Sequence, residues 1–328
     1  SYLAEFLIEK GYEVYGILKR NSVAENQTAR LDMVYHKIKL EYGDLTDMSS
    51  LVRVIQKIMP DEIYNLAAQS HVRISFDQPI YTTNVTGLGT LNLLELFRKH
   101  CPNAVFIFTS TNKVYGDKPN QLPLKEMNSR FEINSKNKFF KGIDETMSID
   151  QSTHSLFGVS KCAADLLTQE YGRNFKLQTG VFRLGCITGP AHSGAQLHGF
   201  LNYLVKANLY EIPYTIFGYK GKQVRDNIHA YDLVNCFWHF FKNPKKGAIY
   251  NIGGGRKNSC SVIEAINIIE NISKIKMLKK YNKKNRVGDH IWYISSNTKF
   301  KKDYKDWNIK YSLKKIIEDI IVEIKGRK

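Results

Sequence analysis

Short apolar runs and longer stretches of mixed polarity alternate along the first two-thirds of the chain. The apolar runs predict β-strands at residues 13–18, 38–43, 62–67, 104–110 and 178–184. The stretches between them carry apolar residues near helical spacing, as Leu88, Leu91 and Leu94 do, and predict helices at residues 1–10, 48–58, 79–99 and 154–175. Residues 117–152 are polar and are expected to form a loop.

Strands that alternate with helices are typical of a doubly wound parallel sheet, so we expect an α/β fold of the Rossmann type. Residues 1–180 are expected to form this domain, joined by residues 228–255. Residues 181–328 are expected to form mainly a smaller C-terminal domain. There, Ser261 and Glu264 have the spacing of a capping box, and Ser312 is expected to cap a terminal helix over residues 313–325.

A Rossmann-type sheet begins with a strand and a Gly-rich turn whose backbone amides meet a pyrophosphate. This chain opens on Ser1 instead of Met, inside the helix predicted for residues 1–10. We therefore expect the first strand and the Gly-rich turn to be missing from this sequence.

The formal net charge of the 328 residues is +17, a value that invites comparison with nucleic-acid-binding proteins. The densest lysine run, residues 274–284, lacks the aromatic ladder of a single-strand binder. Lysine, asparagine and isoleucine are also abundant throughout the chain. We therefore expect a basic cleft suited to an anionic diphosphate, and no nucleic-acid partner.

The cysteines, histidines and apolar residues are arranged in ways that exclude other classes of protein. The five cysteines form no C-x-x-C pair and the nine histidines no H-E-x-x-H cluster, so we expect a reducing, cytoplasmic location and no catalytic metal. No run of 18 apolar residues is present, and no basic segment leads into an apolar one. Neither a membrane span nor a signal peptide is expected.

Two segments carry the candidate chemistry: residues 109–116, T-S-T-N-K-V-Y-G, and residues 154–161, H-S-L-F-G-V-S-K. They resemble the active-site elements of the extended branch of the short-chain dehydrogenases/reductases, the second being its Tyr-x-x-x-Lys element. The resemblance implies that Thr111 hydrogen-bonds the reacting oxygen and that Lys161 holds the nicotinamide ribose. Phe157 stands at the position of the catalytic tyrosine, a base whose pKa is lowered by the lysine one helical turn later.

Phenylalanine has no ionisable group, which leaves two interpretations. In the first, the protein is an enzyme and another group is the base: Lys161, His154, Tyr115 or a water held by Thr111. In the second, the chain binds a nucleotide without turnover. The joint presence of Thr111 and Lys161 favours the enzyme.

Three further segments match cofactor-binding elements of the same superfamily. Lys19 and Arg20 follow the predicted strand 13–18, where a basic residue accommodates a 2′-phosphate, and they favour NADP over NAD. Asp44 and Leu45 resemble the adenine-contacting element. Leu66, Ala67 and Ala68 resemble the strand end at which the backbone approaches the cofactor closely.

The chain resembles two groups of nucleotide-sugar enzymes within this superfamily. Residues 62–92 are similar to GDP-mannose 4,6-dehydratases, whereas residues 110–117, 221–226 and 251–254 are similar to CDP-paratose/CDP-tyvelose 2-epimerases. The second resemblance implies an NAD(P)-dependent epimerase that oxidises C2 of a nucleotide-diphosphate sugar, rotates the keto sugar and reduces its other face. A 4,6-dehydratase is the alternative, but dehydration needs an extra acid/base carboxylate, and Lys113 stands where the dehydratases carry it.

Arg225 and Arg286 lie in G-x-x-x-R-D and R-x-G-D patterns and match the family's pyrophosphate-binding arginines. The resemblance therefore assigns NAD(P) binding to residues 1–180 and substrate binding mainly to residues 181–328. His229 and Asp232 are expected to be structural. A homo-oligomer is also implied, assembled through the helices near residues 79–99 and 154–175.

Overall fold

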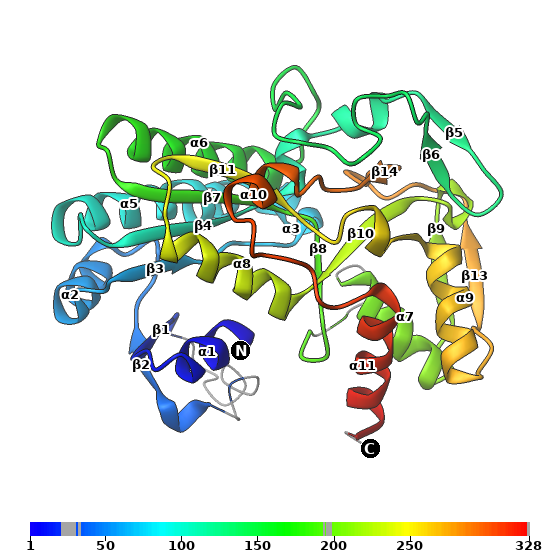
Figure 1. Cartoon of the computed structure of the whole chain (residues 1–328), viewed down its shortest axis with the longest axis horizontal. Coiled ribbons are helices and arrows are strands. Elements are labelled where there is room, and N and C mark those ends of the chain that lie inside the picture. The colour runs from blue at the N-terminus through cyan, green and yellow to red at the C-terminus, as the bar shows by residue number, and fades with distance from the viewer. Residues whose placement is uncertain (21–30, 32–33, 193, 195–198, 327–328) are drawn as a thin grey trace.

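The computed structural model describes residues 1–20, 31, 34–192, 194 and 199–326. Its centre is a parallel sheet of four strands in the order β11-β7-β4-β3 (Figure 1). These strands are β3 (Glu62–Asn65), β4 (Val105–Thr111), β7 (Gln178–Leu184) and β11 (Ala248–Ile252). The α/β fold with a doubly wound parallel sheet, expected from the sequence, is confirmed.

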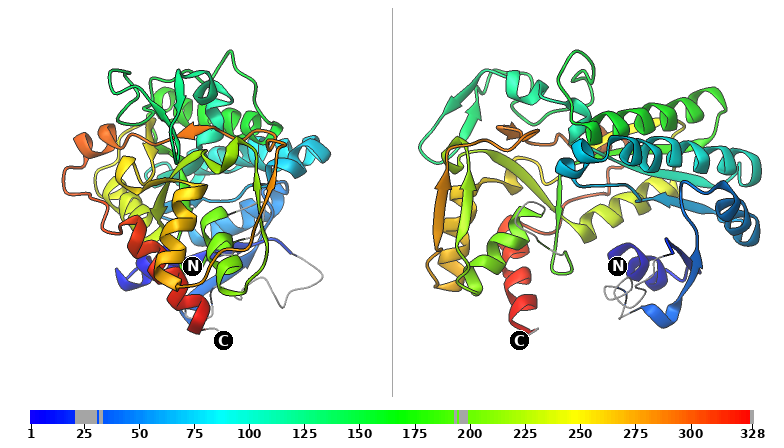
Figure 2. Two further views of the ribbon diagram at one scale, coloured as in Figure 1. Left: turned by 90° about the vertical axis from the view of Figure 1, so that its right-hand side faces the viewer. Right: turned by 180° about the vertical axis from the view of Figure 1, so that it is seen from behind.

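Successive residues of β4 point to opposite faces of this sheet and define its two layers. On one face Phe106 and Phe108 pack with helices α2 (Met48–Ile58), α5 (Gly89–His100) and α6 (Leu156–Asn174). On the other face Val105 and Ile107 pack with α8 (Ala230–Lys242) and α10 (Thr298–Asp303). Figure 2 shows α5 and α6 running along one side of the sheet. Both faces are covered, as the apolar sequence of β4 predicts.

A second parallel sheet contains only β1 (Val14–Leu18) and β2 (Ile38–Tyr42). Beside it, helix α1 (Tyr2–Glu9) packs Phe6 and Leu7 against Val234 of α8. Among the described residues no strand joins this small sheet to β3, and Figure 1 shows β1 and β2 apart from the edge of the main sheet. The strands expected for the Rossmann-type sheet therefore lie in two separate sheets, one of β1 and β2 and one of β3, β4, β7 and β11.

The remaining strands and helices lie at one end of the main sheet (Figure 1). Three strands pair with β10 (Val224–His229): β8 (Cys186–Thr188), β12 (Ser259–Ser261) and β14 (Trp292–Tyr293). Strands β9 (Tyr214–Phe217) and β13 (Lys279–Asn282) pair in parallel. Helices α7 (Phe200–Leu209), α9 (Val262–Ser273) and α11 (Leu313–Gly326) share one hydrophobic core.

Two regions differ from the sequence-based expectation. Residues 117–152, expected to be a loop, contain an antiparallel hairpin of β5 (Leu124–Glu126) and β6 (Phe131–Ile133). The helix expected at residues 79–99 is divided: after α3 (Val72–Asp77), α4 (Pro79–Thr83) continues through a π-helical turn, Asn84–Leu88, into α5. Helix α5 begins at Gly89. A Cβ atom at this position would lie 2.7 Å from the Cβ of Leu45, which is too close, so the packing of α5 against Leu45 favours glycine here.

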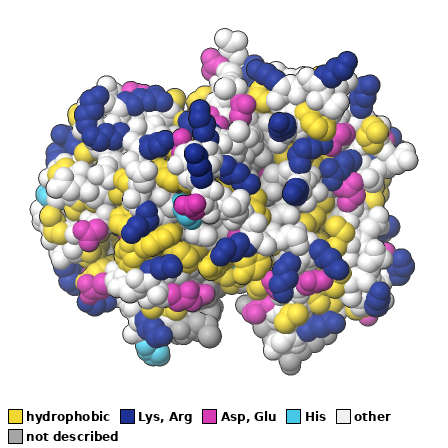
Figure 3. All heavy atoms as spheres, viewed as in Figure 1, with side chains coloured by type: hydrophobic (Ala, Val, Ile, Leu, Met, Phe, Trp, Pro, Cys, Tyr) yellow, Lys and Arg dark blue, Asp and Glu magenta, His cyan; other side chains and the backbone are white. Residues whose placement is uncertain are grey.

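Lys and Arg side chains are spread over the face seen in Figure 3 rather than gathered in one patch. No described helix has both the length and the apolar character that crossing a membrane requires. In the described part of the chain, His, Cys, Asp and Glu side chains form no group of three or more that could hold a metal ion.

Candidate active site

A cleft of about 680 Å³ opens at the carboxyl ends of β3, β4 and β7. Leu66 and Ala68 line it after β3, and Thr111 lines it at the end of β4. Residues of the C-terminal region 181–328, among them Arg225 and Arg286, complete the lining. Ligands of open α/β sheets bind at the carboxyl ends of the strands. The volume also falls in the range of about 300–1,000 Å³ that is typical of small-molecule sites.

The start of α6 brings Phe157 and Lys161 into this cleft. Ser155 caps the helix by accepting a hydrogen bond from the backbone N–H of Gly158 (3.1 Å). A Cβ atom at Gly158 would lie 2.8 Å from a backbone oxygen of the turn that follows β4, so α6 begins directly against that turn. Phe157 and Lys161, one helical turn apart, line the cleft together with Thr111. The structure thus brings together the three residues that the two motifs predict.

Lys161 is 4% exposed, and no described carboxylate forms an ion pair with it. Its side-chain nitrogen donates to the carbonyl oxygen of Thr109 (2.7 Å) and lies 4.6 Å from the ring centre of Phe108. Asp165, one turn further along α6, is held instead by Arg183 through two hydrogen bonds of 2.9 and 3.0 Å. Burial lowers the pKa of Lys161 to about 7, and the opposite effect of Asp165 is weaker.

Two of the substitute bases suggested by the sequence lie outside the cleft. The hydroxyl of the buried Tyr115 donates to Asn251 (2.7 Å) and accepts from Arg183 (3.2 Å), and burial raises the pKa of Tyr115 to about 12. Both ring nitrogens of His154 lie 2.9 Å from backbone carbonyl oxygens. Neither side chain lines the cleft, so neither is placed to meet a substrate there.

Three cations gather at the side of the cleft that residues 286–289 form. Arg225 forms an ion pair with Asp289, and Lys113 donates to the carbonyl oxygen of Gly288 (2.8 Å). Burial, reinforced by Arg225 and Arg286 and opposed by Asp289, lowers the pKa of Lys113 to about 8. Burial alone would raise the pKa of Asp289, but the three cations outweigh it and hold that pKa below its usual value. Because three cations surround a single carboxylate, this side of the cleft has an excess of positive charge and is suited to binding an anion.

The residues predicted to contact the adenosine half of a cofactor lie outside this cleft. Lys19 forms an ion pair with Asp44 (3.0 Å) and donates to the hydroxyl of Tyr81 (3.4 Å). The hydrogen bond to Asp44 raises the pKa of Lys19. The guanidinium carbon of Arg20 lies 4.2 Å from the ring centre of Tyr42. These two cations are therefore close to the end of β1 but already engaged with neighbouring side chains.

Leu45 and Ala67, which were predicted to bind the cofactor, are not among the described residues that line the cleft. Gln223 and Asn227 do line it, and the sequence did not predict them. Both amides are buried, and the side-chain oxygen of each has no hydrogen-bond partner in the described part of the chain. A buried acceptor without a donor is costly, so both oxygens are suited to a ligand hydroxyl. Gln223 shares residues 221–226 with Arg225, which is the one sequence signal that could have found it.

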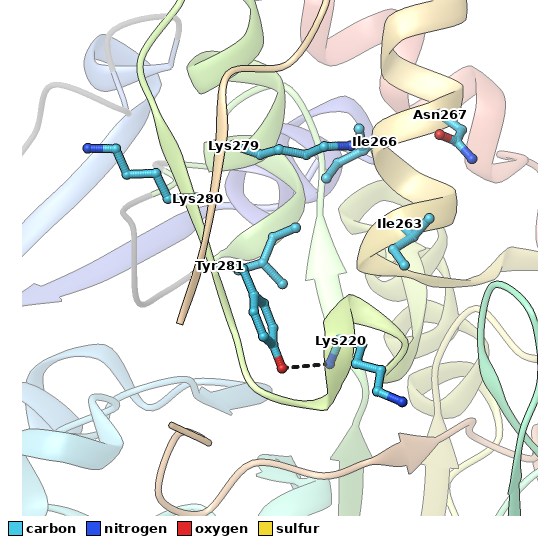
Figure 4. A pocket seen from close by; sticks show the side chains of 8 residues that line it. Lys220, Ile263, Ile266, Asn267, Lys279, Lys280 and Tyr281 are labelled. Carbon is cyan, nitrogen blue, oxygen red and sulfur yellow. Dashed lines mark hydrogen bonds between the residues drawn. The ribbon is translucent and has the colours of Figure 1, made fainter. Parts of the chain in front are cut away.

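A second hollow, of about 370 Å³, lies between β13 and α9 (Figure 4). Its lining includes the apolar side chains of Ile263 and Ile266, and Figure 4 shows Lys279 extending toward Ile266 while Lys280 points away from α9. The hydroxyl of Tyr281 accepts a hydrogen bond from the backbone N–H of Lys220 (3.3 Å). None of the residues predicted to act in catalysis or binding lines this hollow.

Comparison with known proteins agrees with the two resemblances seen in the sequence. The sequence model of the family described as GDP-mannose 4,6 dehydratase matches residues 1–320. The CDP-paratose 2-epimerase of Salmonella typhi is 32% identical over 323 residues, which cover 96% of this chain and 92% of that protein. The human GDP-mannose 4,6 dehydratase is 50% identical over 137 residues, which cover 38% of this chain and 36% of that protein. The dehydratase match thus spans only about a third of the relative's length.

Solved structures share the fold. The UDP-glucose 4-epimerase of Thermotoga maritima, solved with UDP-glucose, has a TM-score of 0.80 at 22% identity and covers 99% of this chain and 95% of its own. The UDP-glucose 4-epimerase of Thermus thermophilus, a complex with NAD, has a TM-score of 0.80 at 20% identity and covers 100% of this chain and 96% of its own.

Proposed function

The chain belongs to the GDP-mannose 4,6-dehydratase family of nucleotide-sugar enzymes, and we propose that it is an NAD(P)-dependent epimerase acting at C2 of a nucleotide-diphosphate sugar. One observation carries this proposal. Thr111 and Lys161 share a single cleft with the arginines Arg225 and Arg286, and the one carboxylate among its described lining residues, Asp289, is bound to a guanidinium. The similarity to a CDP-paratose 2-epimerase over nearly the whole chain supports the same reaction class.

The residues at the carboxyl ends of the main strands fit the nicotinamide half of an NAD(P) cofactor. Leu66 is half-exposed toward the cleft and makes an apolar wall with Ala68, while Thr111 and Lys161 offer hydrogen-bonding groups. When bound, the nicotinamide supplies the acceptor for a hydride from C2 and the donor for its return. Lys19, next to β1, supports NADP over NAD, because a 2′-phosphate can take the place of its present carboxylate partner.

The cations of the cleft are suited to the diphosphate of the substrate. Arg225 and Arg286 are proposed to hold the phosphate oxygens, since a guanidinium binds a diphosphate through paired, charge-assisted hydrogen bonds. Lys113 adds a third charge nearby. The unpartnered oxygens of Gln223 and Asn227 are proposed to accept hydrogen bonds from sugar hydroxyls. The similarity to the CDP-paratose 2-epimerase supports a CDP-sugar.

The same residues argue against dehydration. Removal of water across C5 and C6 needs a carboxylate that exchanges a proton with the sugar. Lys113 follows Asn112 where such a group would stand, and Asp289 is bound to Arg225. Oxidation and reduction at one carbon need no second carboxylate. The hydroxyl at C2 loses its proton as the hydride leaves, the keto sugar rotates, and the hydride returns to the opposite face.

Isotope exchange distinguishes this reaction from its alternatives. The full chain is incubated with NAD(P) and candidate CDP- and GDP-sugars in heavy water, and the products are followed by NMR and mass spectrometry. We expect an inverted C2 without deuterium, because the hydrogen at C2 travels as hydride and is shielded from solvent. Deuterium at C5 with loss of water would favour the 4,6-dehydratase, and no change in any sugar would favour a nucleotide-binding protein without turnover.

A further inference from the structure

An oxidation at C2 needs a group that accepts the hydroxyl proton, and few described side chains lining the cleft are able to do so. Burial raises the pKa of Tyr214 to about 12 and that of Cys186 to about 11, and Asp289 is held by Arg225. His192 comes from the loop after β8 and hydrogen-bonds Asn202 of α7 (3.2 Å). Tyr2 and His192 also line the cleft, but they belong to α1 and to the loop after β8, whereas the lysines Lys113 and Lys161 belong to the two active-site motifs and are the candidates nearest to Thr111 and Phe157 in the sequence.

The position of Lys161 separates it from Lys113. Lys161 lies one turn after Phe157 on α6, and its nitrogen is bound to Thr109, on the strand that ends at Thr111. Lys113 points instead to Gly288, beside the arginines proposed to bind the diphosphate. Lys161 is therefore the amine that is bound to the strand of Thr111, the residue predicted to meet the reacting hydroxyl.

The charged groups packed around Lys161 leave it without a counter-ion. On its own helix, Asp165 is engaged by Arg183 of β7 and also accepts a hydrogen bond from the hydroxyl of Ser110 on β4 (2.6 Å). Among the described charged groups, Asp165 is the one that acts on the pKa of Lys161, and its effect is outweighed by burial. A buried ammonium without a carboxylate partner is unfavourable, so the neutral amine is favoured.

We propose that Lys161 is the proton acceptor of this protein, taking the role that the hydroxyl of a tyrosine at position 157 would otherwise have. The inference rests on the proposed epimerase function. In the forward step the O–H bond at C2 breaks, the proton binds to the lone pair of the Lys161 amine, and the C–H electrons leave as hydride to the nicotinamide. In the return step the hydride goes back to C2 and the Lys161 ammonium gives its proton to the carbonyl oxygen. The hydrogen bond to Thr109 orients the amine through both steps.

The first test measures the titration of Lys161 without any turnover. Lysine side chains of the cofactor-free full chain are isotopically labelled and titrated by NMR, and the signal missing in Lys161→Arg is assigned to Lys161. We expect an apparent pKa near 7, well below the ordinary lysine value of about 10.4. The signal missing in Lys113→Arg serves as the control for a second amine in the same cleft. A Lys161 signal that titrates at an ordinary lysine value overturns the inference, whatever the substrate.

The second test is a double-mutant cycle between positions 157 and 161. Arginine keeps the positive charge but cannot accept a proton, so Lys161→Arg is expected to lower kcat by about 100- to 10,000-fold. Phe157→Tyr restores a hydroxyl base, and beside it the arginine charge still lowers the tyrosine pKa. In the Phe157→Tyr background, Lys161→Arg is therefore expected to cost much less. Lys113→Arg should show no such dependence on residue 157.

The outcomes separate this inference from the proposed function. Equal losses from Lys161→Arg in both backgrounds, with turnover in the parent chain, would mean that Lys161 only positions the cofactor, and would leave the epimerase standing. No turnover of any nucleotide sugar by the parent chain would remove the epimerase, and the base with it. Thermal unfolding of each variant shows whether it is folded. If Lys161→Arg is not folded, Lys161→Met replaces it for assigning the Lys161 signal, and the NMR titration of the parent chain decides the inference.

Discussion

The ion pair between Arg225 and Asp289 lies at the side of the cleft that is proposed to bind the diphosphate of the substrate. Arg225→Ala removes one cation and leaves the Asp289 carboxylate without the guanidinium that offsets its burial. We expect the variant to lose about 1.5–3 kcal/mol of binding free energy for CDP- or GDP-sugars, which is a roughly ten- to hundredfold loss of affinity. NAD(P) affinity should be nearly unchanged, because Arg225 is proposed to bind the sugar nucleotide. Isothermal calorimetry measures both affinities.

A matched cation outside the cleft controls for net charge. Lys220 is exposed and paired with Glu126, so Lys220→Ala removes the same charge without touching the cleft lining. Asp289→Asn in the Arg225→Ala background should restore part of the affinity, because it removes the unpaired carboxylate. Unchanged sugar-nucleotide affinity in Arg225→Ala would take this residue out of the substrate site.

At the scale of elements, the sequence predicts best where a pattern is long or a cap is local. Strand β7 has the expected bounds, and the capping box of Ser261 and Glu264 opens α9 as predicted. The β5–β6 hairpin was missed because strands of three residues are too short to show a period. In the site, Thr111, Phe157 and Lys161 were predicted from two local motifs. The hydrogen bond between Arg225 and Asp289 joins residues 64 positions apart, and no local sequence motif predicts a contact over that separation.

The N-cap of helix α8 is a histidine, so the strength of this cap is expected to vary with pH. The Nδ1 atom of His229 accepts a hydrogen bond from the backbone N–H of Tyr231 (3.1 Å), and the ring stacks on Tyr311 with 4.0 Å between ring centres. Burial lowers the pKa of His229 to about 4. As the pH falls from about 6.5 toward 4, the unfolded chain binds a proton at this histidine before the folded chain does, so stability is lost in that window.

Replacing this cap tests the effect. Asparagine caps a helix without titrating, so His229→Asn should lose less stability than the parent chain between pH 6.5 and 4. His229→Ala, which has no cap, should cost about 0.5–2 kcal/mol at neutral pH. Urea denaturation across this range measures both, with the exposed His36→Asn as the matched control. Parallel pH dependences in the parent chain and His229→Asn would mean that titration of His229 does not cause the loss of stability.

At the scale of the whole molecule, exposed apolar side chains on α4 to α6 support the homo-oligomer implied by the family resemblance. Ile80 is 75% exposed, and Leu88 and Val159 are each about half exposed, on elements that pack together. We expect the protein to self-associate through this face. With a net charge of +17, two copies repel each other, so association should strengthen as salt screens that repulsion.

Ile80→Lys places a charge in the face and should shift the protein toward monomer in sedimentation velocity, whereas Val322→Lys, at a comparably exposed apolar position on α11, should not. A monomer at every salt and protein concentration, or equal effects of the two variants, would place the contact elsewhere or remove it.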